Sequence, residues 1–182
     1  MNLPNLITVI RIAFVPLFIW LLFIAPEKNS LERWLSVTIF VLAIATDGVD
    51  GAIARRKNLV TNLGKLLDPI ADKALLGGAL VSLSILGQLA WWITIVILAR
   101  ELGITIYRLV VAKRRVIAAA GGGKLKTILQ SVAVGFLLSP FDSVLPWLIP
   151  IEHILVYAAL IATLTSGMQF ILEEKKNYRA KQ

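Results

Sequence analysis

The sequence predicts an all-α membrane protein with six transmembrane helices, and two observations carry this prediction. Hydrophobic residues make up 58% of the 182 residues, and the mean hydropathy is +0.80. An average soluble domain is only about half apolar. The apolar residues also gather into runs, several of which approach the roughly 20 residues that a helix needs to cross a bilayer. The length fits a single membrane domain, residues 1–182.

Six apolar segments follow one another along the chain. Breaks at Pro26, around Gly87 and at a cluster of three prolines separate several of them. The first segment has no basic leader before it and no small-residue cleavage site after it. We therefore expect it to be a retained helix and not a signal peptide. The predicted spans are 6–24, 34–55, 65–86, 90–112, 125–139 and 147–172.

Basic residues are distributed unevenly between the two sides of these spans. Of the 19 Lys and Arg residues, 13 fall in the stretches 55–65, 113–126 and 175–181, and only Lys28 and Arg33 fall on the opposite side. Because Lys- and Arg-rich connections stay in the cytoplasm, we expect both termini on the cytoplasmic side of a plasma membrane. The opposite ends carry the aromatic residues expected at a membrane interface, namely Trp34, Trp91, Trp92 and Trp147.

The composition excludes several kinds of chemistry. The chain has no cysteine, so disulfides, zinc–thiolate sites and thiol nucleophiles are absent. The net charge of +8 would favour a nucleic-acid partner in a soluble protein. Here the basic residues lie at the ends of apolar runs, which indicates membrane topology and anionic ligands instead.

Four aspartates lie within the second and third apolar segments, where a carboxylate is costly. Asp47 and Asp50 are three residues apart, and Asp68 and Asp72 are four apart, so each pair shares one helix face. Counted from the flanking basic residues, Asp47 and Asp72 both lie roughly 10–12 Å below the membrane rim. The two acidic faces can therefore meet at matching depth.

Oxygen ligands without Cys or His favour hard divalent cations such as Mg²⁺ or Mn²⁺. Gly51 and Gly64 leave room for a bulky ligand, and Arg55 at the rim suits phosphate recognition. Two other interpretations remain open. The aspartates can pair with Lys73, Arg55 or Arg100 inside the bundle, or they can line the pathway of a divalent-cation transporter.

The stretch from Asp47 to Asp72 resembles the signature of the CDP-alcohol phosphotransferases, D-x2-D-G-x2-A-R-x8-G-x3-D-x3-D, at every fixed position. Segments outside it resemble the branch of this family that makes phosphatidylglycerophosphate in bacteria. They include residues 2–11, 61–73, 99–101 and 124–127. The resemblance implies the six-helix fold of this family, a homodimer, and an active site that opens to the cytoplasm.

The resemblance also implies a reaction and the residues that carry it. CDP-diacylglycerol and sn-glycerol 3-phosphate would give phosphatidylglycerophosphate and CMP. Two divalent cations would be held by Asp47, Asp50 and Asp68, with Asp72 as general base and possible further ligand. The CDP pocket would be lined by the aspartates Asp47 and Asp50 and by Asn5, Thr8, Gly51, Ala54, Arg55 and Gly64. For Asn5 and Thr8, ordinary capping of a helix start is the alternative.

A phosphorylated acceptor requires cations near Asp72. Arg100 and Arg108 are eight residues apart on the fourth segment and share roughly one face. For both arginines, pairing with an acidic residue is the alternative, namely Glu101 or an aspartate in the case of Arg100. Other acceptors within the family, namely phosphatidylglycerol, inositol phosphate and serine, also stay open. The candidates for the acceptor phosphate are Arg100, Arg108, Lys126, Lys65 and Lys124.

Overall fold

The computed structural model describes residues 3–25, 27–56, 62–112 and 123–179. Within these ranges, the side chains of residues 3–7, 47–56, 62–69, 109, 112, 123–124 and 177–179 lie outside the description. The described residues form helices and no strands. They are α1 (Leu3–Ile24), α2 (Leu31–Arg56), α3 (Asn62–Ile85), α4 (Trp91–Ala112), α5 (Gly123–Leu138), α6 (Phe141–Val144) and α7 (Ile149–Arg179), with a 3₁₀ turn, Pro146–Leu148, before α7.

The predicted all-α class is confirmed, and each of the six apolar segments coincides with one long helix. The last helix continues to Arg179, beyond the end of the apolar run at residue 172. The hydrophobic pattern marks where a span ends, but a polar sequence can continue the helix in water. The four-residue helix α6 lies among the prolines that the sequence indicated as a break.

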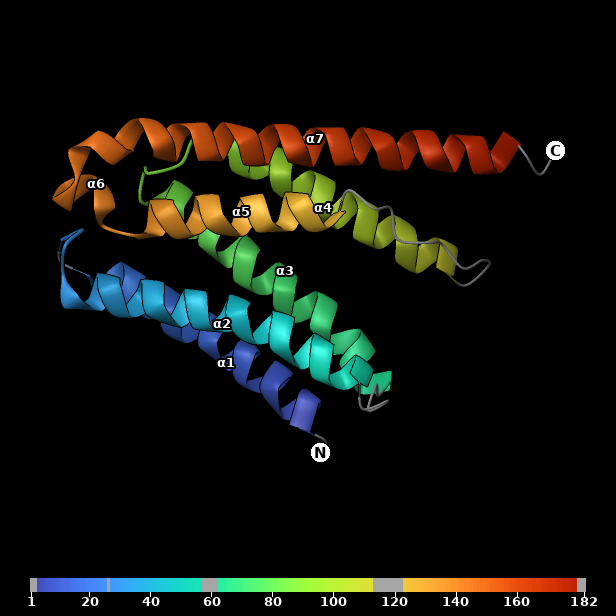
Figure 1. Ribbon diagram of the computed structural model, residues 1–182, viewed down its shortest axis with the longest axis horizontal. Coiled ribbons are helices and arrows are strands. Elements are labelled where there is room, and N and C mark those ends of the chain that lie inside the picture. Colours follow the sequence, from blue (N-terminus) through green and yellow to red (C-terminus); the bar gives the residue numbers. More distant parts are fainter. Residues whose placement is uncertain (1–2, 26, 57–61, 113–122, 180–182) are drawn as a thin grey trace.

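The long helices alternate in direction, so the two ends of the bundle differ (Figure 1). The helices α1, α3 and α5 begin at the end where both chain termini lie, and α2, α4 and α7 end there. We call this the termini end. The opposite end, which we call the far end, carries the connections that precede α2, α4 and α7.

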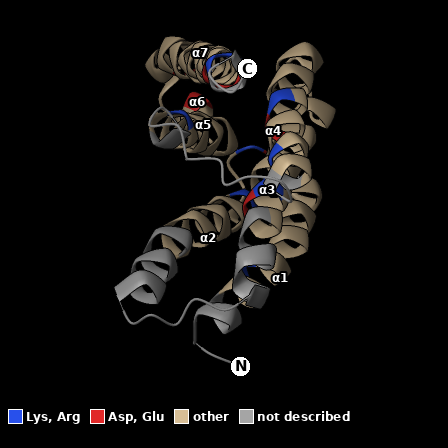
Figure 2. Ribbon diagram, turned by 90° about the vertical axis from the view of Figure 1, so that its right-hand side faces the viewer, with Lys and Arg blue, Asp and Glu red and all other residues tan. Residues whose placement is uncertain are grey.

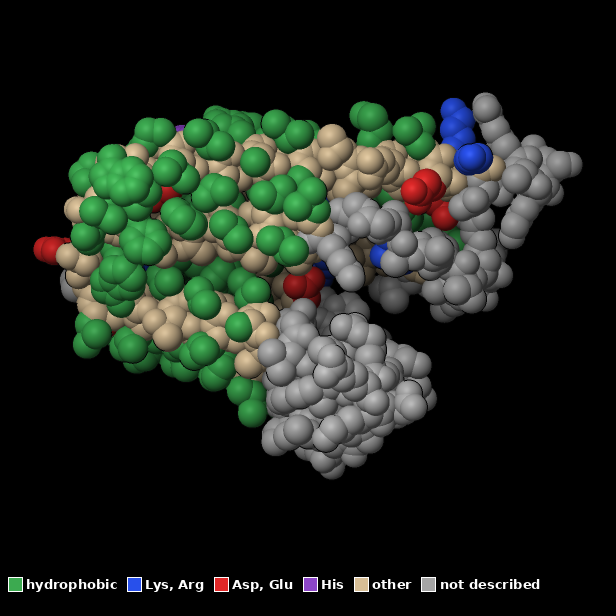
Figure 3. Space-filling model, in the orientation of Figure 1, with side chains coloured by type: hydrophobic (Ala, Val, Ile, Leu, Met, Phe, Trp, Pro, Cys, Tyr) green, Lys and Arg blue, Asp and Glu red, His purple; other side chains and the backbone are tan. Residues whose placement is uncertain are grey.

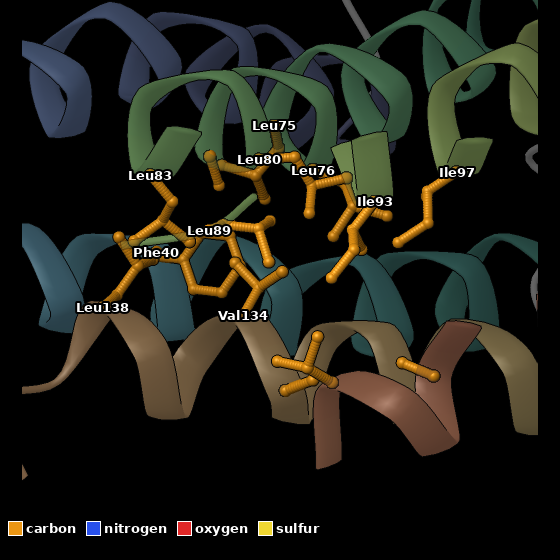
Figure 4. Close-up of a cluster of buried hydrophobic side chains, with 14 of the residues drawn as sticks. Phe40, Leu75, Leu76, Leu80, Leu83, Leu89, Ile93, Ile97, Val134 and Leu138 are labelled. Carbon is orange, nitrogen blue, oxygen red and sulfur yellow. The ribbon is translucent and has the colours of Figure 1, made fainter. Parts of the chain in front are cut away.

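Helix α3 is central, since it packs against α1, α2, α4 and α5. The main core cluster forms around it and includes Leu76, Leu80 and Leu83 from α3, Phe40 from α2 and Leu138 from α5. Figure 4 shows these side chains pointing toward one another between the helices. Phe40, Leu83 and Leu138 have no measurable exposure. The buried side chains are close-packed, and this fixes how α3 crosses its neighbours.

Two adjacent glycines allow neighbouring helices to approach α3 closely. A Cβ atom at Gly78 would lie 3.0 Å from Cδ1 of Ile19 on α1, and one at Gly77 would lie 3.3 Å from Cδ2 of Leu98 on α4. Small residues at such contacts are typical of helix packing in membranes, where van der Waals contact replaces the hydrophobic effect.

At the far end, buried Arg33 joins three segments. Its Nε donates to the carbonyl oxygen of Leu138 at 2.6 Å, and its Nη2 donates to the carbonyl of Leu137 at 3.1 Å and to Oε1 of Gln88 at 2.6 Å. The last carbonyls of a helix have no partner within the helix, so a cation there satisfies them. The sequence indicated only a topological role for this arginine.

The outer surface is strongly apolar. Each long helix carries one or more large hydrophobic residues that are at least half exposed. Figure 3 shows hydrophobic side chains covering much of the far half of one face. Examples are Trp20, Val41, Ile70, Ile95, Ile128 and Ile154. A water-exposed surface rarely carries so many, whereas lipid accommodates them.

Among the described residues, one helix, Pro146–Lys176, is long and apolar enough by length and composition alone to cross a membrane. The apolar stretches Thr8–Ile24 and Leu125–Leu138 are shorter. Charged residues such as Lys73 in α3 and Arg100 in α4 interrupt the apolar sequence of other helices. The number of six spans therefore stays a prediction.

Replacing Gly78 by leucine should lower the melting temperature in detergent, because the new side chain would meet Ile19 on α1. Overpacking of this kind costs about 1–3 kcal/mol. Gly135→Leu is the matched control, since a Cβ there has nothing within 4 Å among the described atoms. Equal melting temperatures for the two variants would contradict the close approach of α1 and α3.

Candidate functional site

The predicted metal ligands lie near the termini end of α2 and α3. Asp47 and Asp50 are in the second half of α2, and Asp68 and Asp72 are in the first half of α3. The side chains of Asp47, Asp50 and Asp68 lie outside the described residues, so their convergence stays a prediction. The predicted roles of seven further residues also lie outside the described side chains and stay predictions. These residues are Asn5, Gly51, Ala54, Arg55, Gly64, Lys65 and Lys124.

Thr8 is described, and it is 2% exposed. Helix α1 begins at Leu3, so Thr8 lies in its second turn and cannot cap its start. The capping alternative is therefore wrong for this residue. Because α1 packs against both α2 and α3, Thr8 is buried on the helix that adjoins the two aspartate-bearing helices.

A basic cavity of about 190 Å³ opens between α3, α4, α5 and α7. Its cationic residues are Lys73, Arg100, Arg108 and Lys126, and its one acidic residue is Glu101. Figure 2 shows charged segments of α3 and α4 in the middle of the molecule. The remaining lining is Ile104, Thr105, Thr127, Ser166, Gln169 and Phe170. With four cations and one carboxylate, the basic cavity is suited to an anion.

Glu101 is the centre of this charge cluster. It is 3% exposed and contacts cations from three helices. Lys73 on α3 donates to its Oε2 at 2.5 Å, Arg100 on α4 donates to its Oε1 at 3.0 Å, and Lys126 on α5 also donates to Oε1. A buried carboxylate of this kind offsets part of the repulsion between the three cations.

The two arginines of the basic cavity retain unused hydrogen-bond donors. Arg100 Nη2 donates to Oγ of Ser166 at 2.8 Å, and the guanidinium of Arg108 lies 5.2 Å from the ring centre of Phe170. The Nε atoms of both arginines are buried without a hydrogen-bond partner in the described part of the chain. Buried donors are normally paired, so these two unsatisfied Nε groups belong to arginines that line a cavity suited to an anion.

Asp72 lies at the edge of this cluster. Its side chain is 42% exposed, and its Oδ2 is 3.9 Å from Nζ of Lys73. Lys73 therefore lies between Asp72 and Glu101. The sequence indicated that Lys73 is a partner for carboxylates. In the structure Lys73 contacts two carboxylates, and Glu101 is closer to it than Asp72.

Three of the five predicted acceptor cations, Arg100, Arg108 and Lys126, line the same cavity. The alternative pairing of Arg100 with Glu101 is present, and the role of these cations toward an acceptor stays a prediction. Sequence reasoning did not assign a role in the cavity to Glu101 or Ser166. A carboxylate inside an apolar run was the available signal for Glu101, whereas Ser166 gave none.

Comparisons with known proteins agree with the geometry. The family model described as CDP-alcohol phosphatidyltransferase matches residues 1–165. A probable phosphatidylglycerophosphate synthase of Mycobacterium tuberculosis is 42% identical, over 93% of this chain and 80% of its own. The CDP-diacylglycerol–glycerol-3-phosphate 3-phosphatidyltransferase of Bacillus subtilis is 38% identical, over 98% and 96%. A protein of the same name from Shigella flexneri is 35% identical over 93% of both chains.

Gly167→Ala should weaken the binding of glycerol 3-phosphate, because a Cβ at Gly167 would lie 3.3 Å from Cγ and 3.4 Å from Nε of Arg100. Displacing one charged donor should cost about threefold to tenfold in affinity, measured by calorimetry in detergent. Gly103→Ala on α4 is the control, since nothing described lies within 4 Å of its Cβ position. Equal affinities in the two variants would refute this role for Gly167.

Proposed function

We propose that this chain, which belongs to the CDP-alcohol phosphatidyltransferase family, transfers the phosphatidyl group of CDP-diacylglycerol to sn-glycerol 3-phosphate and releases CMP. The names of its relatives from Bacillus and Shigella support this reaction, since they match nearly the whole chain at 38% and 35% identity. The aspartate signature from Asp47 to Asp72 supports the same chemistry.

One observation carries the choice of a phosphorylated acceptor: the basic cavity lies next to Asp72. Lys73 lines this cavity and its Nζ is 3.9 Å from the Asp72 carboxylate. An acceptor whose phosphate is held by Arg100 and Arg108 can therefore present its hydroxyl toward Asp72. Serine carries no phosphate, and its single carboxylate would bring less negative charge to a cavity with four cations and one carboxylate.

In the proposed reaction, the acceptor hydroxyl attacks the β-phosphorus of CDP-diacylglycerol, and the bond to CMP breaks. Asp72 takes the hydroxyl proton as general base. Arg100, Arg108 and Lys126 hold the acceptor phosphate, and Lys65 and Lys124 are further candidates. Glu101 keeps Arg100 and Lys126 in position, which fixes the acceptor relative to the base.

The residues of the signature fit divalent cations. The four aspartates lie on α2 and α3, which pack against each other, and carboxylates are the ligands that Mg²⁺ and Mn²⁺ prefer. Asp47, Asp50 and Asp68 would hold two such ions, with Asp72 as a further ligand. When bound, the ions supply positive charge that stabilises the diphosphate of the CDP-lipid. Asn5, Thr8, Gly51, Ala54, Arg55 and Gly64 would line the CDP pocket.

The proposed setting is a bacterial plasma membrane, with six spans and both termini in the cytoplasm. The apolar outer surface supports a lipid environment, and the arrangement of α1 to α7 is consistent with both termini on one side. The aspartates and the basic cavity then face the cytoplasm, where the water-soluble acceptor is available. A homodimer follows from the family resemblance and forms part of the same proposal.

Purified chain in detergent should release CMP from CDP-diacylglycerol when Mg²⁺ or Mn²⁺ and glycerol 3-phosphate are present. Separate reactions with inositol phosphate, phosphatidylglycerol and serine test the acceptor, and a reaction with EDTA tests the metal. The absence of CMP with every acceptor would refute the transferase function. Release with inositol phosphate but not with glycerol 3-phosphate would refute the acceptor, and full activity in EDTA would refute the metal requirement.

Asp72→Asn should lower turnover by about 100-fold or more, because general-base catalysis typically contributes 10²–10⁴-fold. The binding of CDP-diacylglycerol should change little. Asp142→Asn, at the far end, is the matched control and should keep full turnover. Wild-type turnover in Asp72→Asn would remove this aspartate from the mechanism.

A further inference from the structure

A second cavity lies at the far end of the bundle, at the opposite end from the predicted metal site. Its volume is about 250 Å³, and it lies between α4, α5, α6 and α7. Half of its lining is apolar, including Leu89, Ile93 and Val156. We call it the far-end cavity. Its polar lining residues are Lys28, Gln88, Asp142, Glu152, His153 and Tyr157.

Glu152 lines this cavity, and one of its two carboxylate oxygens has no hydrogen-bond partner in the described part of the chain. The residue is 7% exposed, and its Oε1 is buried without a hydrogen-bond partner among the described residues. An acidic residue in the first turn of a helix is favoured by the helix dipole, and Glu152 is in the first turn of α7. That effect explains a solvated carboxylate, but it does not explain a buried oxygen that accepts no hydrogen bond.

Four of the five other polar residues around the far-end cavity have partners in the structure. Lys28 pairs with Asp142, and Nδ1 of His153 lies 2.8 Å from the carbonyl oxygen of Ile149. Gln88 Oε1 accepts from Arg33. The charges of Lys28 and Asp142 balance, so the carboxylate of Glu152 leaves the cavity with an excess of negative charge.

The excess of negative charge and the unpaired carboxylate oxygen favour a cationic ligand with N–H donors. The described residues do not bring together three or more His, Cys, Asp or Glu side chains that could hold a metal ion, so a metal is disfavoured here. A primary ammonium group can instead offer three donors and one positive charge to a single carboxylate.

The position of the cavity indicates where such an ammonium group comes from. Trp91, Trp92 and Trp147 are exposed at the same end of the bundle, and tryptophans of this kind mark the head-group level of a membrane. The polar and apolar lining together suit an amphiphile. A volume of 250 Å³ lies below the range of about 300–1,000 Å³ for whole ligands, so it fits a head group whose acyl chains remain in the bilayer.

We infer that the far-end cavity binds the primary ammonium head group of an aminophospholipid, with Glu152 as the acceptor of its N–H donors. This site is separate from the transferase chemistry and does not depend on it. It lies at the end of the bundle opposite to the proposed active site.

A head-group series on the unmodified protein tests this inference. Delipidated full-length chain in detergent is titrated with phosphatidylethanolamine, its N-monomethyl and N,N-dimethyl forms and phosphatidylcholine, all with the same acyl chains, and bound lipid is counted by native mass spectrometry. The positive charge is constant while N–H donors are removed one by one. We expect phosphatidylethanolamine to bind about tenfold more tightly than phosphatidylcholine, with the methylated forms between them.

Two variants assign the preference to one residue. Glu152→Gln keeps the shape of the side chain but removes its charge, and it should bind phosphatidylethanolamine and phosphatidylcholine equally. Glu27→Gln, at an exposed position of the same end, should keep the wild-type preference. CMP release by both variants verifies that they are folded.

Three results would overturn the inference. Equal binding across the head-group series in the wild-type chain would exclude ammonium recognition. A wild-type preference in Glu152→Gln would exclude this residue. Displacement of bound phosphatidylethanolamine by free ethanolamine at similar concentrations would assign the cavity to a soluble amine and not to a lipid. Because the first and third results need no variant, the test stands even if Glu152→Gln fails to fold.

Discussion

Glu101 holds cations from α3, α4 and α5 around one buried carboxylate, and the basic cavity depends on this arrangement. Without the carboxylate, Lys73, Arg100 and Lys126 would repel one another in surroundings of low dielectric constant. Breaking a buried ion pair by removing one partner is strongly destabilising, because the other charge remains buried. The same contacts that join the three helices therefore also determine where the donors of the site point.

The two ends of the bundle have opposite electrostatic character. The basic cavity carries four cations against one carboxylate, whereas the far-end cavity has one balanced ion pair and a further carboxylate with one unpaired oxygen among the described residues. Inside an apolar bundle, an excess of positive or negative charge is tolerated only when a group of opposite charge offsets it. The chain supplies Glu101 at the first site. At both sites a ligand of opposite charge would complete the pairing.

Much of the fold could be predicted from the sequence, because apolar runs of helical length are a local property. The sharing of one cavity by Arg100 and Arg108 could also be predicted from their spacing along α4. The contacts of Glu101 with Lys73 and Lys126 could not, since they depend on how α3, α4 and α5 cross. The burial of Arg33 was missed for the same reason. Two of its three acceptors are backbone carbonyl groups more than a hundred positions away, and a backbone carbonyl has no signature in a sequence.

The hydrogen bonds of Arg33 limit how the lengths of two connected segments can change during evolution. One guanidinium contacts the end of α5 and the connection between α3 and α4, so both segments must stay within reach of the same side chain. An inserted residue in either segment would move a hydrogen-bond acceptor by about the 3.8 Å between neighbouring Cα atoms, which exceeds the tolerance of a hydrogen bond. Insertions and deletions are therefore constrained at this end, although surface connections elsewhere usually accept them.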